Sequence, residues 1–231
     1  MKIRKLLLCL IVLALLVGSA TGEEVTIPTA TLSPEAAALP WNLTIVNSDN
    51  PVPDDWTIEF TELKNNQRVD SRIYPELQAM FDACRADGLK PMVMTSYRTY
   101  DDQKAMLTRK YKQYRNSGMS HSEAQAAALK VAMYPGYSEH QLGLAVDIDS
   151  ADTSTCSNDS VWSWMKQHCQ EYGFIWRYPG EKSDITGISN ESWHYRYVGV
   201  EAATYIMENG ICLEEYLNQF YGIPLPGSSN G

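Results

Sequence analysis

The sequence has a deficit of basic residues. Its 231 residues include 19 Lys and Arg against 28 Asp and Glu, which gives a formal net charge of −9. Nucleic-acid binding needs a basic face for the phosphate backbone, so we expect no nucleic-acid partner. The chain also lacks both common glycine-rich phosphate-binding patterns and has no internal repeat. Hydrophobic residues at 44% and charged residues at 20% exclude a disordered or fibrous chain and predict one or two packed domains.

Long hydrophobic runs are absent except near the N-terminus. The apolar stretch from Leu6 to Val17 follows three basic residues and precedes a run of small residues. This pattern is typical of a secretory signal peptide, and the apolar run is short for a membrane span. We expect residues 1–22 to be cleaved off, with cleavage after Ala20 as a variant, so that the mature chain acts outside the cytoplasm. An uncleaved N-terminal anchor is the alternative, and would be the chain's membrane contact.

Cysteine is scarce and forms no C-x-x-C pair, which argues against a thiolate metal site. Beyond the predicted signal peptide the sequence holds four cysteines, at positions 84, 156, 169 and 212. An even number of cysteines in an exported protein permits disulfides. We expect Cys156 to pair with Cys169 across a short loop that enters a helix, and buried free thiols are the alternative.

After the predicted signal peptide, the chain divides into three further parts by composition. Residues 23–40 are rich in Thr, Ala and Pro and predict a flexible linker, residues 41–222 form the folded domain, and residues 223–231 predict a disordered tail. The predicted helices span residues 75–86, 100–133 with a break at 116–118, 161–172, 201–208 and 213–221, and the predicted strands span 90–96, 144–149, 174–178 and 193–198. These elements predict an α+β domain in which helices pack around a small, largely antiparallel sheet.

Histidine is also rare, with four residues in the chain, and two of the four have unusual neighbours. His140 lies in a polar turn that leads through Gly143 into a strand carrying Asp147, and His194 lies in a later strand. Two imidazoles and one carboxylate suit zinc, and three protein ligands leave a position for water. The alternatives are hydrogen-bonded structural histidines, or a calcium site that includes Asp147 and Asp149. His121 and His168 have ordinary surface neighbours and receive no function.

Glu191 precedes His194 by three residues and supplies a carboxylate close to the proposed metal. A catalytic zinc site needs a base that takes a proton from water and is not itself a ligand. The same group can then protonate a departing amine. These residues together predict metal-assisted hydrolysis of an amide bond.

Three ordered motifs resemble those of one family. The segment from Ser138 to Asp147 resembles the S-x-H-x-x-G-x-A-x-D signature of the VanY-type zinc D-alanyl-D-alanine carboxypeptidases, and Glu191 to His194 resembles their E-x-W-H signature. The segment from Ser96 to Gln103 is similar to their S-x-R-[ST]-x-x-x-Q motif. The resemblance extends over about residues 41–221. It implies the fold of the D,D-peptidases and the hedgehog signalling domain, a small antiparallel sheet flanked by helices.

The resemblance also implies a role for each matching residue. His140, Asp147 and His194 would hold Zn²⁺, and Glu191 would be the general base and acid. Arg98 would stabilise the substrate and its developing oxyanion, a role that suits a permanently charged guanidinium with two donors. Gln103 and Ser138 would donate to the terminal carboxylate of the peptide.

The function implied by the resemblance is removal of the C-terminal D-alanine from peptidoglycan stem peptides by a bacterial, extracytoplasmic monomer. The first alternative is an L,D-carboxypeptidase that trims the tetrapeptide stem with the same metal and base. A noncatalytic cell-wall binding module is a second alternative. The residues that separate D,D from L,D specificity lie in pocket walls that the sequence does not locate.

Overall fold

The computed structural model describes residues 25, 27, 28 and 32–227. The predicted signal peptide, residues 1–22, lies outside the described residues, as do part of the predicted linker and the last four residues. Among the helices of the described part, none is both long enough and apolar enough to cross a bilayer.

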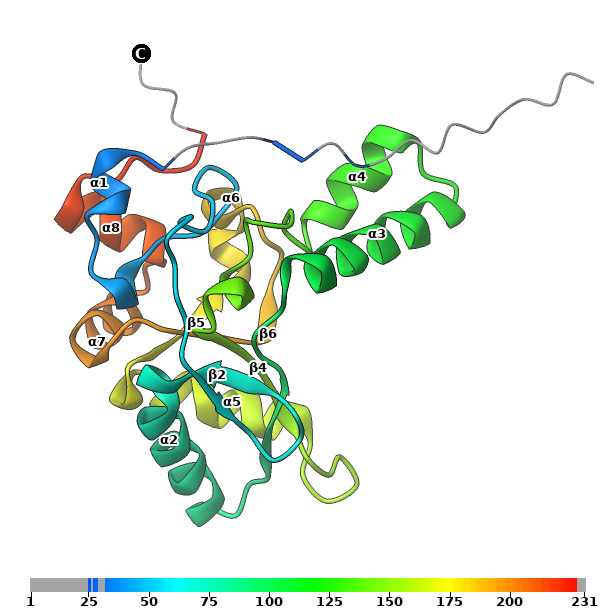
Figure 1. Cartoon of the computed structure of the whole chain (residues 1–231). Helices are drawn as coiled ribbons and strands as arrows, with labels where there is room; N and C mark the ends of the chain where they lie inside the picture. The colour runs from blue at the N-terminus through cyan, green and yellow to red at the C-terminus, as the bar shows by residue number, and fades with distance from the viewer. Residues whose placement is uncertain (1–24, 26, 29–31, 228–231) are drawn as a thin grey trace, which may run out of the picture.

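A four-stranded antiparallel sheet forms the centre of the described molecule (Figure 1). Its strands are β3 (Pro91–Thr95), β4 (Ala145–Ser150), β5 (Phe174–Tyr178) and β6 (Glu191–Tyr197). They lie in the order β3-β4-β6-β5, with every neighbouring pair antiparallel. The predicted α+β class with a small antiparallel sheet is therefore confirmed.

A separate hairpin of β1 (Phe60–Glu62) and β2 (Arg68–Asp70) was not predicted from the sequence. Its strands have three residues each, too few to produce a recognisable alternation of apolar and polar side chains. The hairpin turn contacts the central sheet, because the Asn65 side-chain amide donates to the carbonyl of Val93 on β3. Tyr97 donates its backbone N–H to the carbonyl of Arg68 on β2.

The described part of the chain has eight α-helices. They are α1 (Pro34–Ala37), α2 (Tyr74–Ala86), α3 (Tyr100–Asn116), α4 (His121–Leu129), α5 (Asn158–His168), α6 (Ser183–Thr186), α7 (Val200–Asn209) and α8 (Leu213–Tyr221). Single 3-10 turns occupy residues 41–43, 71–73, 139–142, 169–172 and 180–182. Helices α2 and α5 share a hydrophobic cluster with the sheet, α7 and α8 form a second cluster, and α3 packs on α4 in a third (Figure 1).

Several helix boundaries differ from the prediction, and the helix predicted to reach residue 172 ends at His168, followed by a 3-10 turn. Helix α5 begins three residues before the predicted start, since Ser157 accepts a hydrogen bond from the Ser160 amide and caps the helix. Helix α4 ends at Leu129, so the predicted helical stretch to residue 133 is wrong over its last turn. Residues 133–137 form the loop that leads into the turn carrying His140.

The segments on either side of the domain are more ordered than predicted. Within the expected flexible linker, α1 forms and Ala36 is buried in the α7–α8 cluster. Within the expected tail, Ile223 is buried in the same cluster and its carbonyl accepts a hydrogen bond from Asn218. Apolar side chains in both segments have a hydrophobic surface to pack on, which composition alone does not reveal.

The predicted Cys156–Cys169 disulfide is wrong. The four cysteines of the described chain, at positions 84, 156, 169 and 212, are free and buried. Burial raises the pKa of the Cys84, Cys169 and Cys212 thiols to about 12. The alternative interpretation, buried neutral thiols that act as small apolar side chains, is the one the structure supports.

Candidate metal centre

Asp147 and His194 are adjacent because they are direct partners across the β4–β6 ladder. The flanking residues Val146 and Ile148 are completely buried in the core, and strand alternation places Asp147 on the opposite face. Partner residues of an antiparallel pair have Cβ atoms about 4.5–5.5 Å apart, close enough for two side chains to hold one metal. Asp149 instead accepts a hydrogen bond from the Trp162 indole, so the structure gives no support to the calcium alternative.

His140 reaches the same place from the 3-10 turn over Glu139–Leu142. Gly143 ends this turn with φ 72°, and a Cβ there would lie 3.1 Å from the Asp70 amide nitrogen. The chain can therefore turn sharply from His140 into β4. The His140 Nδ1 atom lies 2.7 Å from the Ser96 carbonyl oxygen. Because a carbonyl only accepts, Nδ1 carries the hydrogen and Nε2 presents its lone pair to the site.

Three ligand atoms converge at this point. Asp147 Oδ1 lies 3.4 Å from His140 Nε2 and 3.2 Å from His194 Nδ1, and the ligand atoms of all three residues lie within 4.8 Å of one another. Two of the atoms, His140 Nε2 and Asp147 Oδ1, are buried without a hydrogen-bond partner. Zinc bonds of about 2.0–2.1 Å in a tetrahedral site separate neighbouring ligand atoms by about 3.3 Å. The two distances to Asp147 and the donor set therefore fit zinc.

Glu191 lies beside this cluster, with its Oε2 atom 3.7 Å from His194 Nδ1. It is the first residue of β6, and its carbonyl accepts a hydrogen bond of 2.8 Å from the Trp176 indole. Burial raises the pKa of Glu191 to about 7, against the opposing effect of His194. A carboxyl group with this pKa can both accept and return a proton near neutral pH.

Arg98 faces the cluster from the loop that follows β3. Its Nη2 atom lies 3.7 Å from Asp147 Oδ2, and its Nη1 donates to Gln103 Oε1 at 2.5 Å. Its Nε atom is buried without a hydrogen-bond partner, which leaves a charged donor for a bound molecule. Gln103 in turn donates to the Met133 carbonyl at 2.7 Å, so its hydrogen bonds hold Arg98 in place.

All seven residues singled out in the sequence line one pocket of about 180 Å³. They are Arg98, Gln103, Ser138, His140, Asp147, Glu191 and His194. They come from segments up to 96 positions apart in the chain, from residue 98 to residue 194. Such a concentration of titratable and unpartnered groups in one pocket marks a candidate active site.

Comparisons with known proteins agree with this geometry. The family model of VanY, D-alanyl-D-alanine carboxypeptidase, matches residues 66–200, which is more than half of the chain. The chain belongs to the VanY family. It is 46% identical over 206 residues to a D-alanyl-D-alanine carboxypeptidase of Enterococcus faecalis, covering 87% of this chain and 76% of the relative.

Solved structures give the same result for the fold of this VanY-family chain. VanYB in complex with D-alanine-D-alanine is 47% identical, has a TM-score of 0.77, and covers 78% of this chain and 99% of that one. A VanY variant from a VanB-type resistance cassette, in complex with Zn(II), has a TM-score of 0.74 at 47% identity, covering 78% and 100%. The LdcB LD-carboxypeptidase is 33% identical with a TM-score of 0.60, covering 77% and 86%. The predicted family, carboxypeptidase class and zinc cofactor are thus confirmed.

The two histidines of the VanY-family site differ in their electrostatic environment. Burial, together with the positive charge of Arg98, lowers the pKa of His140 to about 4. Burial also lowers the pKa of His194, but the neighbouring carboxylates of Asp147 and Glu139 more than offset this and raise it to about 9. The two histidines overcome the effect of burial on Asp147 and hold its pKa well below the usual range. Asp147 is therefore ionised and competent as a ligand.

The sequence did not indicate two residues that lie against the proposed metal ligands. The Glu139 carboxylate lies 3.4 Å from His194 Nε2, and the Tyr178 ring lies 4.8 Å from the His194 ring. Glu139 stands inside the longest motif, next to His140, but a motif does not state which way an intervening side chain points. Tyr178 lies at the end of a predicted strand whose partner was not known, because the β5–β6 pairing is a long-range feature.

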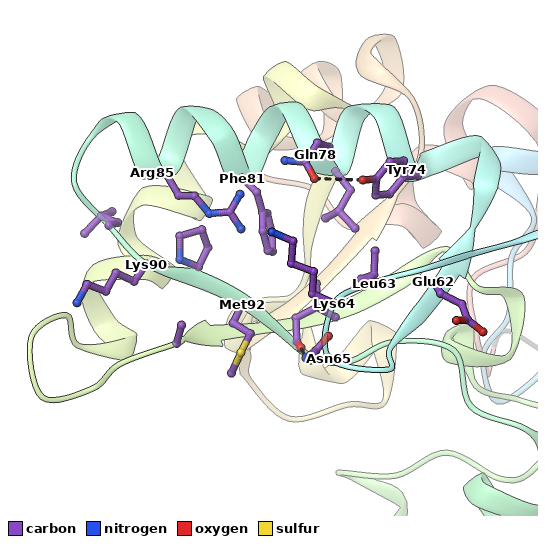
Figure 2. Close-up of a pocket in the computed structure, with 15 residues that line it drawn as sticks. Glu62, Leu63, Lys64, Asn65, Tyr74, Gln78, Phe81, Arg85, Lys90 and Met92 are labelled. Atoms are coloured by element: carbon purple, nitrogen blue, oxygen red, sulfur yellow. Dashed lines mark hydrogen bonds between the residues drawn. The ribbon is translucent and has the colours of Figure 1, made fainter.

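A second pocket of the described chain is larger, at about 650 Å³, and lies between α2, the β1–β2 turn and β3 (Figure 2). Its walls include Leu63, Leu77 and Phe81, and none of the predicted site residues lines it. Tyr74 and Gln78 hydrogen-bond to each other along its α2 wall at 3.3 Å (Figure 2).

Proposed function

We propose that this chain is a zinc-dependent carboxypeptidase that removes the C-terminal D-alanine from peptidoglycan stem peptides. The observation that carries the proposal is the cluster of His140, Asp147 and His194, in which both histidines lie at the distance from Asp147 that a tetrahedral zinc site has. The cluster also includes two buried ligand atoms without a hydrogen-bond partner. The fold and the family then give the reaction class. The relative with 46% identity is a D-alanyl-D-alanine carboxypeptidase by name, and the solved VanY variant with 47% identity is named a D,D-pentapeptidase.

The proposed roles follow from what each group can do chemically. Zinc, when bound, supplies a Lewis acid that lowers the pKa of water and polarises the scissile carbonyl. Glu191 takes a proton from the attacking water on its carboxylate and then gives it to the nitrogen of the departing D-alanine. Because its pKa is about 7, both transfers are accessible at neutral pH. Glu191 is thus the general base and acid of the proposal.

Substrate binding is assigned to the group of side chains opposite the metal. Arg98 binds the C-terminal carboxylate or the developing oxyanion through its unpartnered Nε and the other N–H groups at the edge of its guanidinium. Gln103 holds the Arg98 guanidinium through its own carbonyl oxygen. Ser138 lies in the pocket wall and offers a hydroxyl donor to the same carboxylate.

We further propose that residues 1–22 direct export and that the domain of residues 41–222, on which α1 and Ile223 also pack, acts as a monomer at the cell envelope. The cationic start and short apolar run of the sequence support export. The substrate class of the family supports it too, because peptidoglycan lies outside the membrane. A comparison of the N-terminus of the secreted protein with the encoded one tests the cleavage.

The decisive experiment is mass spectrometry of synthetic stem peptides after incubation with the mature protein. We expect loss of one alanine from the pentapeptide, abolished by a chelator and restored by zinc. Release from the tetrapeptide alone would replace the D,D assignment with the L,D alternative, for which the likeness to LdcB is the supporting observation. Binding of muropeptides without turnover would support the noncatalytic module.

A further inference from the structure

Glu139 is a buried carboxylate next to the metal cluster that the proposed mechanism does not use. Its side chain has no exposed surface, and it lies within the 3-10 turn that carries His140. Its Oε1 atom accepts from Arg177 Nε at 2.8 Å and from Arg196 Nη1 at 3.0 Å. Its Oε2 atom points the other way and lies 3.4 Å from His194 Nε2.

Two arginines and a second glutamate hold Glu139 in this orientation. Arg177 makes two further hydrogen bonds, of 2.8 and 2.6 Å, to Glu214 at the start of α8. Arg196 also donates to the carbonyls of residues 42 and 44, which anchors it to the N-terminal part of the domain. The cluster contains two positive and two negative side chains, so the buried charges are balanced. Buried charges need such partners, and Glu139 therefore stays ionised and fixed.

We propose that Glu139 is a positioning residue for the metal, which it serves by fixing the tautomer of His194. A carboxylate only accepts hydrogen bonds, so Glu139 keeps a hydrogen on Nε2 of His194. When zinc is bound, the Nδ1 lone pair on the other side of the ring, next to Asp147, is then the one that meets the metal. The inference rests on the proposed zinc function. Glu139 itself binds neither metal nor substrate. It holds the hydrogen of His194 on Nε2, so that Nδ1 can bind zinc.

The other metal histidine shows the same arrangement with a different acceptor. His140 donates from Nδ1 to the backbone carbonyl of Ser96, and its Nε2 is the ligand. The two rings thus present opposite nitrogens to the metal, each fixed by an acceptor on its far side. The acceptor of His140 belongs to the backbone, whereas that of His194 is a side chain that substitution can change.

Glu139→Gln and Glu214→Gln form a matched pair for testing the inference. Each substitution removes one negative charge from the same buried cluster and preserves side-chain shape, but Glu139 alone contacts a metal ligand. In the Glu139→Gln variant the amide oxygen must stay toward the two arginines, because both only donate. The amide NH₂ then faces His194 Nε2 and favours the wrong tautomer, with hydrogen on Nδ1.

The readouts are zinc affinity, measured by competition with a chromophoric chelator, and stability of the metal-free protein, measured by urea unfolding. We expect Glu139→Gln to weaken zinc binding about 10- to 100-fold, the usual range for an outer partner of a metal histidine. Glu214→Gln should lower the urea midpoint comparably and leave zinc affinity within about threefold of wild type. Equal effects of both variants on zinc affinity would overturn the inference, as would wild-type affinity in Glu139→Gln.

A second measurement needs no variant. In the zinc-loaded wild-type protein with ¹⁵N-labelled histidine, the ¹H–¹⁵N spectrum should show His194 with hydrogen on Nε2 and metal on Nδ1. Hydrogen on Nδ1 would overturn the inference even if Glu139→Gln fails to fold. Absence of zinc binding by the wild type would refute the proposed function and this inference together, whereas normal wild-type binding with an unaffected variant refutes the inference alone.

Discussion

The two pockets described above differ in chemistry as well as in volume. The larger pocket, of about 650 Å³, is lined by Lys64, Arg85 and Lys90, and the last two have acidic partners. Arg85 pairs with Asp82 at 3.1 Å, and Lys90 pairs with Asp152 at 2.8 Å. In the described structure, no residue that lines this pocket has a buried side-chain atom without a hydrogen-bond partner.

The smaller pocket, of about 180 Å³, is lined by buried polar atoms that lack partners. Arg98 Nε, His140 Nε2 and Asp147 Oδ1 are three of the four such side-chain atoms in the described structure. Buried polar groups are normally paired, so a concentration of unpaired ones needs an explanation. A bound metal and a bound carboxylate explain them. The smaller pocket is therefore distinguished from the larger one by its unpartnered buried polar atoms and not by its volume.

Removal of a metal ligand should have the largest effect on the smaller pocket. We expect His140→Ala to lose zinc and, with it, all measurable carboxypeptidase activity, since two remaining ligands do not make a zinc site. Metal content by atomic emission and alanine release from the pentapeptide measure both. Gln78→Ala, in the wall of the larger pocket, is the matched control and should keep its zinc and its activity. Retention of zinc by His140→Ala would contradict the assignment.

Removal of the base should separate chemistry from metal binding. Glu191→Gln keeps the size of the side chain but cannot take a proton, so we expect turnover to fall about 10²- to 10⁴-fold with zinc retained. Glu62→Gln, a carboxylate in the wall of the larger pocket, should leave turnover unchanged. Full activity in Glu191→Gln would exclude Glu191 as the general base.

Arg98→Ala should have a smaller effect on catalysis. Loss of one charged donor to an oxyanion or carboxylate typically costs about 10²- to 10³-fold in rate, and we expect a fall of this order in kcat/KM. Arg85→Ala removes a cation from the larger pocket and should not alter kcat/KM. The urea midpoint of both variants should stay near that of wild type. If the two arginine variants have equal activity, Arg98 has no special role.

Much of the fold and the site could be predicted from the sequence, because side-chain periodicity and short motifs are local features of the chain. Alternation along residues 144–149 predicts that Asp147 faces away from the core, and the structure has this arrangement. The β1–β2 hairpin is too short to give such a signal. The order of α1 and Ile223 depends on packing against α7 and α8, which are distant in sequence from α1.

The contact between Glu139 and His194 is a long-range feature as well. The two residues are 55 positions apart, and the arginines that orient Glu139 come from two different strands. A motif names the ligands, but not the acceptors that fix the ligand rings. The favoured disulfide was wrong for a related reason, since sequence spacing does not state where thiols point.

The core beneath the larger pocket offers a last test of the comparison. Cys169 belongs to the same hydrophobic cluster as Leu77 and Phe81 of that pocket, and burial raises the pKa of its thiol to about 12. An unfolded thiol ionises near pH 8.5, so the stability that this thiol contributes is present below that pH and is lost as the pH rises toward 12. Urea unfolding at about pH 8 and about pH 10.5 should show wild type losing about 2 kcal/mol more than Cys169→Ala does. Equal losses would mean that the Cys169 thiol ionises as readily in the folded protein as in the unfolded one. Water would then reach the hydrophobic core beneath the larger pocket.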